Sequence, residues 1–231
     1  MKLAIMQPYF LPYIGYWQLL SAVDVFVVYD NVQYTKKGWI NRNRFLLNGS
    51  DRLFTLQLKR DSDGLDVRCR SLAEDFKRER LIAQLEGAYR KAPYFRAAFP
   101  IINEIIRCEH ENLFDYIANS IRVIADYLGI KTPLVVSSTV SIDHTLRAEN
   151  KVLALCKSLG ADRYINAIGG QSLYHQEEFA ACGIELSFLQ TRPIRYQQFG
   201  NPFVPNLSIV DVLMFNDHAA VYDMLGQYDL L

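Results

Sequence analysis

The fold is decided by residues 2–29, which read KLAIMQPYFLPYIGYWQLLSAVDVFVVY. The apolar run 2–6 predicts a short buried strand, and residues 14–22 predict a helix. The loop between them contains Pro8 and Pro12, which exclude a strand ladder or a helix interior because proline lacks a backbone N–H. Residues 24–29 form a continuous apolar run, typical of a strand buried on both faces. Strand, helix and strand make a βαβ unit, whose two strands should be parallel with a right-handed crossover.

Later segments extend this pattern. Runs 44–47 and 53–58 flank Asn48-Gly49 and predict a hairpin, and a third short strand is expected at 67–70. A helix should end near Arg90, and Pro100 is expected to open or interrupt the next one. A core stripe with helical spacing then predicts a helix that Gly129 terminates; its members are Phe114, Ile117, Ile121, Ile124 and Leu128.

Alternation of strands and helices resumes after residue 130. Strands are expected at 134–136, 163–165 and 184–189, and helices at 173–182, 208–215 and 219–225. A further helix, capped by Thr145 and ended by Gly160, should lie between the first two of these strands. The sequence thus predicts one α/β domain over residues 1–231. A mostly parallel, nucleotide-binding-like central sheet is joined by a helical insertion near 72–130 and by C-terminal helices.

Composition and charge exclude several classes of protein. Lys plus Arg and Asp plus Glu both number 25, and this balance argues against general nucleic-acid binding, which favours a basic excess. No apolar run is long enough for a bilayer span, and the N-terminus lacks a signal-peptide core, so we expect a cytoplasmic protein. The four cysteines form no CxxC pair and have no histidine at metal-ligand spacing. We therefore expect small buried thiols and no metal site.

Ligands in parallel sheets bind beyond the carboxyl ends of the strands. In this sequence that rule selects the loops 7–13, 30–43, 137–145, 166–174 and 190–208, which should share one rim. The first loop opens a helix where such folds place phosphates, and Gln7, Tyr9 and Tyr13 are its candidate binding residues. It contains no standard phosphate-loop motif. The histidines of nucleotidylyltransferases are also missing around Gly15. Simple packing of these aromatics on the sheet is an equal alternative.

The second loop, residues 30–43, combines three cations, two aromatic residues and four amide side chains. Amides and aromatic rings suit the recognition of sugars or nucleosides, and arginine suits two-point contact with phosphate or carboxylate. A surface hairpin with ordinary charges is the alternative. We favour binding, because function concentrates in loops on a rigid scaffold. The candidate binding residues are Gln33, Tyr34, Lys37, Trp39, Asn41, Arg42 and Asn43.

Candidate proton acceptors lie in two of the rim loops. Asp30 begins the second loop, and His144 follows Asp143 near a helix start, where Asp143 is expected to satisfy backbone donors. Asn166 with Gly169-Gly170 follows another strand and suggests close backbone approach to a ligand, or only a tight turn. Residues 208–211 fit a capping box with Asp211 at its third helical position, which we prefer to a catalytic role.

Several motifs in one order resemble those of the WbqC-like family. The segments that carry the resemblance are 7–10, 12–16, 30–34, 37–43, 164–166, 169–170 and 207–211, and the match extends over nearly the whole chain. The sequence departs from the family pattern at Asn31, where an acidic residue is expected. The resemblance implies a role in the synthesis of O-antigen or other surface polysaccharides, with a glycine (aminoacyl) transferase activity suggested. It implies no catalytic residues and no particular cofactor.

Three hypotheses for function follow. The first is transfer of an aminoacyl or similar acyl group from a donor to a sugar or nucleotide-sugar precursor. Asp30 or His144 would take the proton, and Tyr34 and Trp39 would stack on the sugar or base. Phosphate on the donor or acceptor would be held by Lys37, Arg42 and the Gly169-Gly170 turn. The second is nucleotide-dependent activation with ATP near residues 9–15. The third is a non-enzymatic partner of polysaccharide-assembly enzymes.

Overall fold

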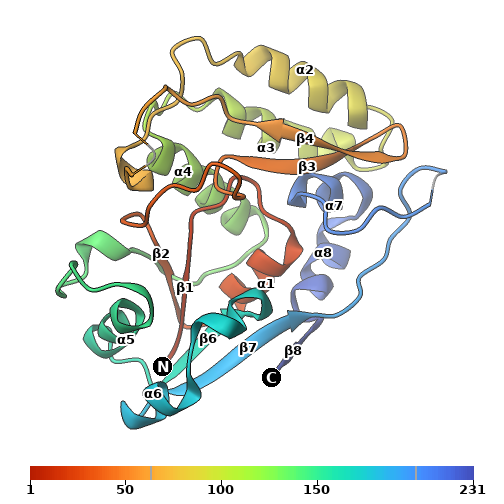
Figure 1. The fold of residues 1–231 in the computed structure, drawn as a ribbon. Coiled ribbons are helices and arrows are strands. Elements are labelled where there is room, and N and C mark those ends of the chain that lie inside the picture. Colours follow the sequence, from red (N-terminus) through yellow and green to blue (C-terminus); the bar gives the residue numbers. More distant parts are fainter. Residues whose placement is uncertain (63, 201) are drawn as a thin grey trace.

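The structure is a computed structural model that describes residues 1–62, 64–200 and 202–231 (Figure 1). Its centre is a six-stranded sheet with the strand order β5-β2-β1-β6-β7-β8. The first five strands in this order are mutually parallel, and β8 is antiparallel to β7. The mostly parallel α/β sheet expected from the sequence is thus confirmed. The strands are β1 (Lys2–Met6), β2 (Val25–Val28), β5 (Leu134–Val136), β6 (Arg163–Ala167), β7 (Glu185–Thr191) and β8 (Tyr228–Leu230).

The predicted βαβ unit is present at the start of the chain. Strands β1 and β2 pair in parallel, with Leu3 opposite Val25 and Met6 opposite Val28, and α1 (Ile14–Ser21) connects them. Strand β2 lies on one side of β1 and β6 lies on the other. The loops that follow β1 and β6 therefore flank the point where the strand order changes direction, where ligands bind in open α/β sheets.

Alternate residues of the central strands face two separate cores, because successive side chains in a strand point to opposite faces. Ala4 and Phe26 belong to a large core that contains α1, α7 (Ile209–Phe215) and α8 (His218–Leu225). Leu3 and Val27 belong to a smaller core covered by α5 (Ala148–Ser158) and α6 (Gln176–Ala181). The sheet is thus buried on both faces, as its apolar strands predicted.

A two-stranded hairpin and three helices extend the large core beyond the sheet. Strands β3 (Arg42–Leu47) and β4 (Ser50–Thr55) pair across the Asn48-Gly49 turn, and both positions have positive φ. The predicted hairpin is therefore confirmed, with its strands displaced toward the N-terminus. Figure 1 shows the hairpin beside α2 (Arg78–Tyr89), α3 (Phe95–Arg107) and α4 (Leu113–Tyr127), at the end of the molecule away from both termini. Gly129, with φ of 72°, ends α4 as expected.

Two predictions in the middle of the chain were wrong. Residues 67–70 are not a strand; they contain the 3₁₀ helix η1 (Val67–Cys69), which local backbone bonds such as Arg70 N to Val67 O close. Pro100 neither opens nor interrupts a helix, since it lies within α3. Its missing N–H leaves the Arg96 carbonyl without a helical donor, and both residues are exposed, so water can satisfy that group.

Three further predictions after residue 130 require correction. Thr145 does not cap α5, which begins at Ala148; Asp143 Oδ1 instead accepts hydrogen bonds from the Thr145 backbone and hydroxyl in a preceding turn. Residues 168–173 form the 3₁₀ helix η3 (Ile168–Leu173), so α6 is shorter than expected. The last element is the strand β8 rather than a helix. The sequence did not predict this strand, because a short edge strand gives little sequence signal.

Two expectations from composition have different outcomes. Of the four thiols only Cys156 is buried, and burial raises its pKa to about 12. Cys69 is exposed and the other two are half-buried, so the expectation of four buried thiols was wrong. Among the described residues, none of the helices is both long and apolar enough to span a bilayer.

Candidate functional site

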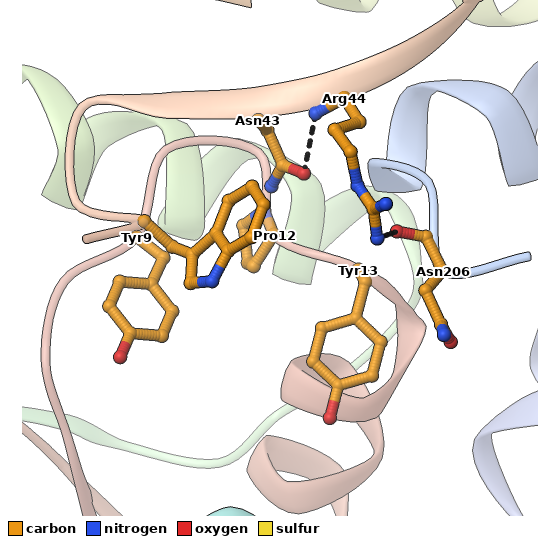
Figure 2. A pocket seen from close by; sticks show the side chains of 7 residues that line it. Tyr9, Pro12, Tyr13, Asn43, Arg44 and Asn206 are labelled. Carbon is orange, nitrogen blue, oxygen red and sulfur yellow. Dashed lines mark hydrogen bonds between the residues drawn. The ribbon is translucent and has the colours of Figure 1, made fainter. Parts of the chain in front are cut away.

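An open cavity of about 290 Å³ lies where the β1–α1 loop meets the hairpin (Figure 2). Two tyrosines and a proline come from the β1–α1 loop, the segment before β3 supplies a tryptophan, and β3 itself supplies an asparagine and an arginine. One asparagine comes from the late loop before α7. The lining residues are Tyr9, Pro12, Tyr13, Trp39, Asn43, Arg44 and Asn206. This set, the aromatic pocket, contains four of the residues proposed from sequence: Tyr9, Tyr13, Trp39 and Asn43.

The β1–α1 loop is held from several sides. Its Phe10 backbone N–H donates to Ile40 O at 2.9 Å, and Asn43 Nδ2 donates to Leu11 O at 2.9 Å. The Ser208 hydroxyl also donates to Leu11 O, at 2.7 Å. Leu11 has a φ of 46°, a left-handed conformation that costs energy for a residue with a Cβ. The three donors fix this turn, and with it the position of the two flanking tyrosines.

Trp39 is the most exposed aromatic ring of the pocket, with 42% of its surface accessible. The guanidinium groups of Arg44 and Arg42 lie 5.5 and 5.8 Å from the centre of its ring, within cation–π distance. Arg42 also donates to the carbonyls of Gly38 and Lys37 and so closes the loop that carries the indole. Trp39 therefore presents an exposed ring, and the two arginines hold the ring and its loop in place.

Tyr9 and Tyr13 lie on two sides of the pocket, and Figure 2 shows both hydroxyls directed away from the hairpin. Burial raises the pKa of both phenols, so they remain neutral hydrogen-bond donors at physiological pH. Gly15 makes room for Tyr13: a Cβ at this position would lie 2.4 Å from the Tyr13 hydroxyl oxygen. This steric requirement explains why a glycine stands in the first turn of α1.

The late loop that contributes Asn206 is anchored by Asp211, which is fully buried. Asp211 Oδ1 accepts from the Tyr89 hydroxyl at 2.9 Å, and Oδ2 accepts from the Tyr196 hydroxyl at 2.7 Å and from Gln198 Nε2 at 2.6 Å. Burial raises the pKa of this carboxyl, and the three donated hydrogen bonds oppose that rise. Asp211 therefore does not complete a capping box as expected. Ser208 does cap α7, because its hydroxyl accepts from Val210 N.

A second network joins Asp30 and His144, the two proposed proton acceptors. Ser137 Oγ lies 2.7 Å from both Asp30 Oδ1 and Asn31 Oδ1, and Asp30 also accepts from Ser138 N at 2.9 Å. His144 Nε2 lies 3.0 Å from Val140 O, so this nitrogen carries the proton. His144 Nδ1 lies 3.0 Å from Asn31 Nδ2 and accepts from it in the neutral form. Both ring nitrogens are therefore occupied within the protein.

This network makes one prediction for stability. Ser137→Ala should lower the free energy of unfolding by about 1–3 kcal/mol, because it leaves buried polar groups of residues 30 and 31 without a partner. Ser138→Ala is a matched control, since its contribution to Asp30 comes from the backbone N–H and is retained. Urea unfolding of the two variants measures the difference, and equal stability would show that the Ser137 hydroxyl contributes little.

Other residues proposed from sequence lie elsewhere. Tyr34 and Asn41 are buried and bond to each other at 2.8 Å, and the Arg70 guanidinium lies 4.7 Å from the centre of the Tyr34 ring. Asn166 donates to the Tyr164 hydroxyl, and a Cβ on Gly170 would lie 3.2 Å from the Asn166 side chain. Of the residues proposed from sequence, Tyr34, Asn41, Asn166 and Gly170 do not line the aromatic pocket. Neither do Gln7, Gln33, Lys37, Arg42 or Gly169.

Three pocket residues were missed in the sequence. Arg44 was assigned only to a strand, and Pro12 and Asn206 were treated only as parts of loops. Arg44 donates to the Asn206 carbonyl at 3.2 Å, across 162 positions of sequence, and pairs with Asp51 at 3.4 Å. The alternation of β3 offered a signal for Arg44, because its half-buried position lies between buried Asn43 and Phe45. Nothing local indicated Asn206.

Comparison with known proteins shows the family to which the chain belongs. The model of the WbqC-like protein family matches residues 7–223, so the chain belongs to this family. An uncharacterized protein of Mycobacterium tuberculosis (strain ATCC 25618 / H37Rv), Rv1507c, is 29% identical over 238 residues, covering 97% of each chain. No solved structure matches significantly. Membership of the family is thus shown, and the matched region includes both the aromatic pocket and the Asp30–His144 network.

Proposed function

We propose that this protein is a transferase that binds a sugar precursor in the aromatic pocket and places an aminoacyl or related acyl group on it, for surface polysaccharide synthesis. The observation that carries the proposal is the grouping of Tyr9, Tyr13 and Trp39 around one open cavity. Flat aromatic rings cover the apolar faces of a sugar, while a few polar groups at the edge fix its orientation. Asn43, Arg44 and Asn206 are polar residues that line the cavity.

The size of the cavity supports a single sugar ring rather than a complete nucleotide sugar. Its volume of about 290 Å³ lies just below the range for small-molecule sites, roughly 300–1,000 Å³. An adjoining cavity of about 520 Å³ shares Asn206 and is lined by Arg192, Arg195 and the late proline loop. In this proposal the second cavity takes the carrier part of the precursor, whether a nucleotide or a diphosphate-linked group.

The transfer step itself rests on family membership and on the proposed proton acceptors. The attacking sugar amine or hydroxyl would form a bond to the acyl carbon, its proton would pass to Asp30 or His144, and the donor's leaving group would depart. Asp30 begins the same loop that carries Trp39. His144 would have to exchange one of its present hydrogen bonds for the substrate, because both of its ring nitrogens already have partners.

Replacement of Trp39 with alanine tests the sugar site. A nucleotide sugar at about 100 times its dissociation constant stabilises a protein by about 2.7 kcal/mol, which corresponds to roughly 5–10 °C for a domain of this size. We expect such a shift in the wild type, and we expect Trp39→Ala to weaken binding at least about tenfold, equivalent to the loss of about 1.4 kcal/mol. Thermal-shift titration with a panel of nucleotide sugars measures both effects.

The control variant is Tyr222→Ala, which removes another exposed aromatic ring, on α8. It should retain the full ligand response. The chain has two tryptophans, and Trp17 is fully buried, so quenching of tryptophan fluorescence by the ligand would report on Trp39. A ligand-induced shift that persists unchanged in Trp39→Ala would refute the pocket as the sugar site.

A further inference from the structure

Lys151 is a buried cation on the side of the sheet covered by α5. Only 5% of its surface is accessible, and burial lowers the pKa of its amine. Its ammonium group donates to the Asn31 carbonyl at 3.2 Å and lies 5.1 Å from the centre of the Tyr29 ring. A lysine has three N–H donors, so these contacts leave donors to spare. The sequence offered a signal, because Lys151 stands one turn from Leu155 on the buried face of the helix.

The neighbouring carboxylates do not neutralise this charge by direct contact. Asp66 and Asp30 are near enough to raise the pKa of Lys151, but Asp66 pairs with Arg68 at 3.8 Å and Asp30 accepts from Ser138. Among the residues that the structure describes, none of the carboxylates forms an ion pair with Lys151. A buried charge without a counterion costs several kcal/mol, so its retention needs a reason.

Further groups suited to an anion surround the amine. Arg147 lies near enough to both Tyr29 and Lys151 to lower the pKa of each. The Tyr29 phenol has a pKa raised to about 12, chiefly by burial, and so keeps its proton to donate. Tyr174, which also acts on Tyr29, bonds to the Tyr164 hydroxyl at 3.4 Å. The Lys151 ammonium group and the Tyr29 ring thus lie in contact just beyond the end of β2, and Arg147 is near enough to act on both.

We propose that Lys151, Arg147 and Tyr29 bind a phosphoryl group of a small molecule beyond the carboxyl end of β2. Phosphate supplies a counterion to Lys151 and accepts several charge-assisted hydrogen bonds, with arginine suited to two-point contact. The position follows the rule for ligands of parallel sheets, because Tyr29 directly follows β2 and Asn31 lies two residues further. This site is separate from the aromatic pocket, with which it shares no lining residue.

Substitution of Lys151 with methionine tests the site. Methionine keeps the length and apolar packing of the buried stem and removes an unpaired buried charge, so the variant should fold with stability equal to or above that of the wild type. Lys157→Met, on the exposed face of the same helix, is the matched control. The probes are inorganic phosphate, pyrophosphate and uridine diphosphate, titrated at constant ionic strength and followed by thermal shift and phosphorus NMR.

We expect at least one of these probes to bind the wild type and Lys157→Met alike. Affinity should fall at least about tenfold in Lys151→Met and should also fall in Arg147→Ala. Binding of inorganic phosphate identifies a free-phosphate site, whereas binding of uridine diphosphate alone identifies a nucleotide site. Unchanged affinity in folded Lys151→Met, or no binding of any probe, would overturn the proposal. Acetate, titrated in the same way, is the control anion, and binding of acetate but not of phosphate would overturn the phosphoryl assignment. Trp39→Ala should leave phosphate binding intact, which separates this test from that of the sugar site.

Discussion

Asp211→Ala should lower the free energy of unfolding by about 3–5 kcal/mol, a large share of the roughly 5–15 kcal/mol of a typical domain. The substitution removes the acceptor for two tyrosine hydroxyls and one amide, all directed at a fully buried carboxylate. A buried donor left without a partner costs about 1–3 kcal/mol. The Tyr89 hydroxyl, which also accepts from Leu46 N, would lose its fixed position, so the defect should spread to β3.

Asp211→Asn separates the loss of an acceptor from the loss of volume. The amide retains the shape of the side chain but turns one acceptor into a donor, so the cost should be intermediate, about 2 kcal/mol. Asp223→Ala, an exposed position on α8, should change stability by less than about 0.5 kcal/mol. Urea unfolding followed by circular dichroism measures all three. If Asp211→Ala has the same free energy of unfolding as the Asp223→Ala control, the hydrogen bonds of Asp211 do not hold the late loop.

Stability should also fall steeply as the pH rises above about 10. Four tyrosines are at most 2% exposed, and burial raises the pKa of each above the ordinary value of 10.0: Tyr16, Tyr89, Tyr116 and Tyr164. Above that pH the unfolded chain releases these protons while the folded chain retains them. The unfolded state then binds fewer protons, so alkali favours unfolding. Each tyrosine contributes about 1.4 kcal/mol per pH unit, hence together about 5 kcal/mol per unit.

Urea unfolding at about pH 9 and about pH 11 measures this slope. Tyr16→Phe is the informative variant, because its hydroxyl makes a hydrogen bond of 3.2 Å to Gln7 O and its ring packing is retained. It should reduce the slope by about 1.4 kcal/mol per pH unit. Tyrosinate absorbance should rise together with the loss of circular dichroism. Ionisation of these tyrosines in a protein that keeps its native spectrum would contradict the prediction.

The aromatic pocket shows how far local sequence patterns reach. Tyr9, Tyr13 and Trp39 lie in loops that follow two neighbouring parallel strands, so the sequence predicted their common rim, and the structure brings them to one cavity. Tyr34 belongs to the same loop and the same residue class as Trp39, yet it is buried against Arg70 and Asn41. The direction of a side chain in a loop depends on distant partners, which no local pattern specifies.

The sequence by itself determined the α/β class, the parallel βαβ start and most of the helices. These depend on apolar periodicity and on turn residues, which act over a few positions of chain. The tertiary structure alone decided that Asn206 completes a pocket with Arg44, that Asp211 accepts three hydrogen bonds instead of completing a capping box, and that Lys151 is a buried cation. The physical reason is that each of these depends on hydrogen bonds and desolvation between segments far apart in the chain. Only the packed fold brings such segments within contact distance.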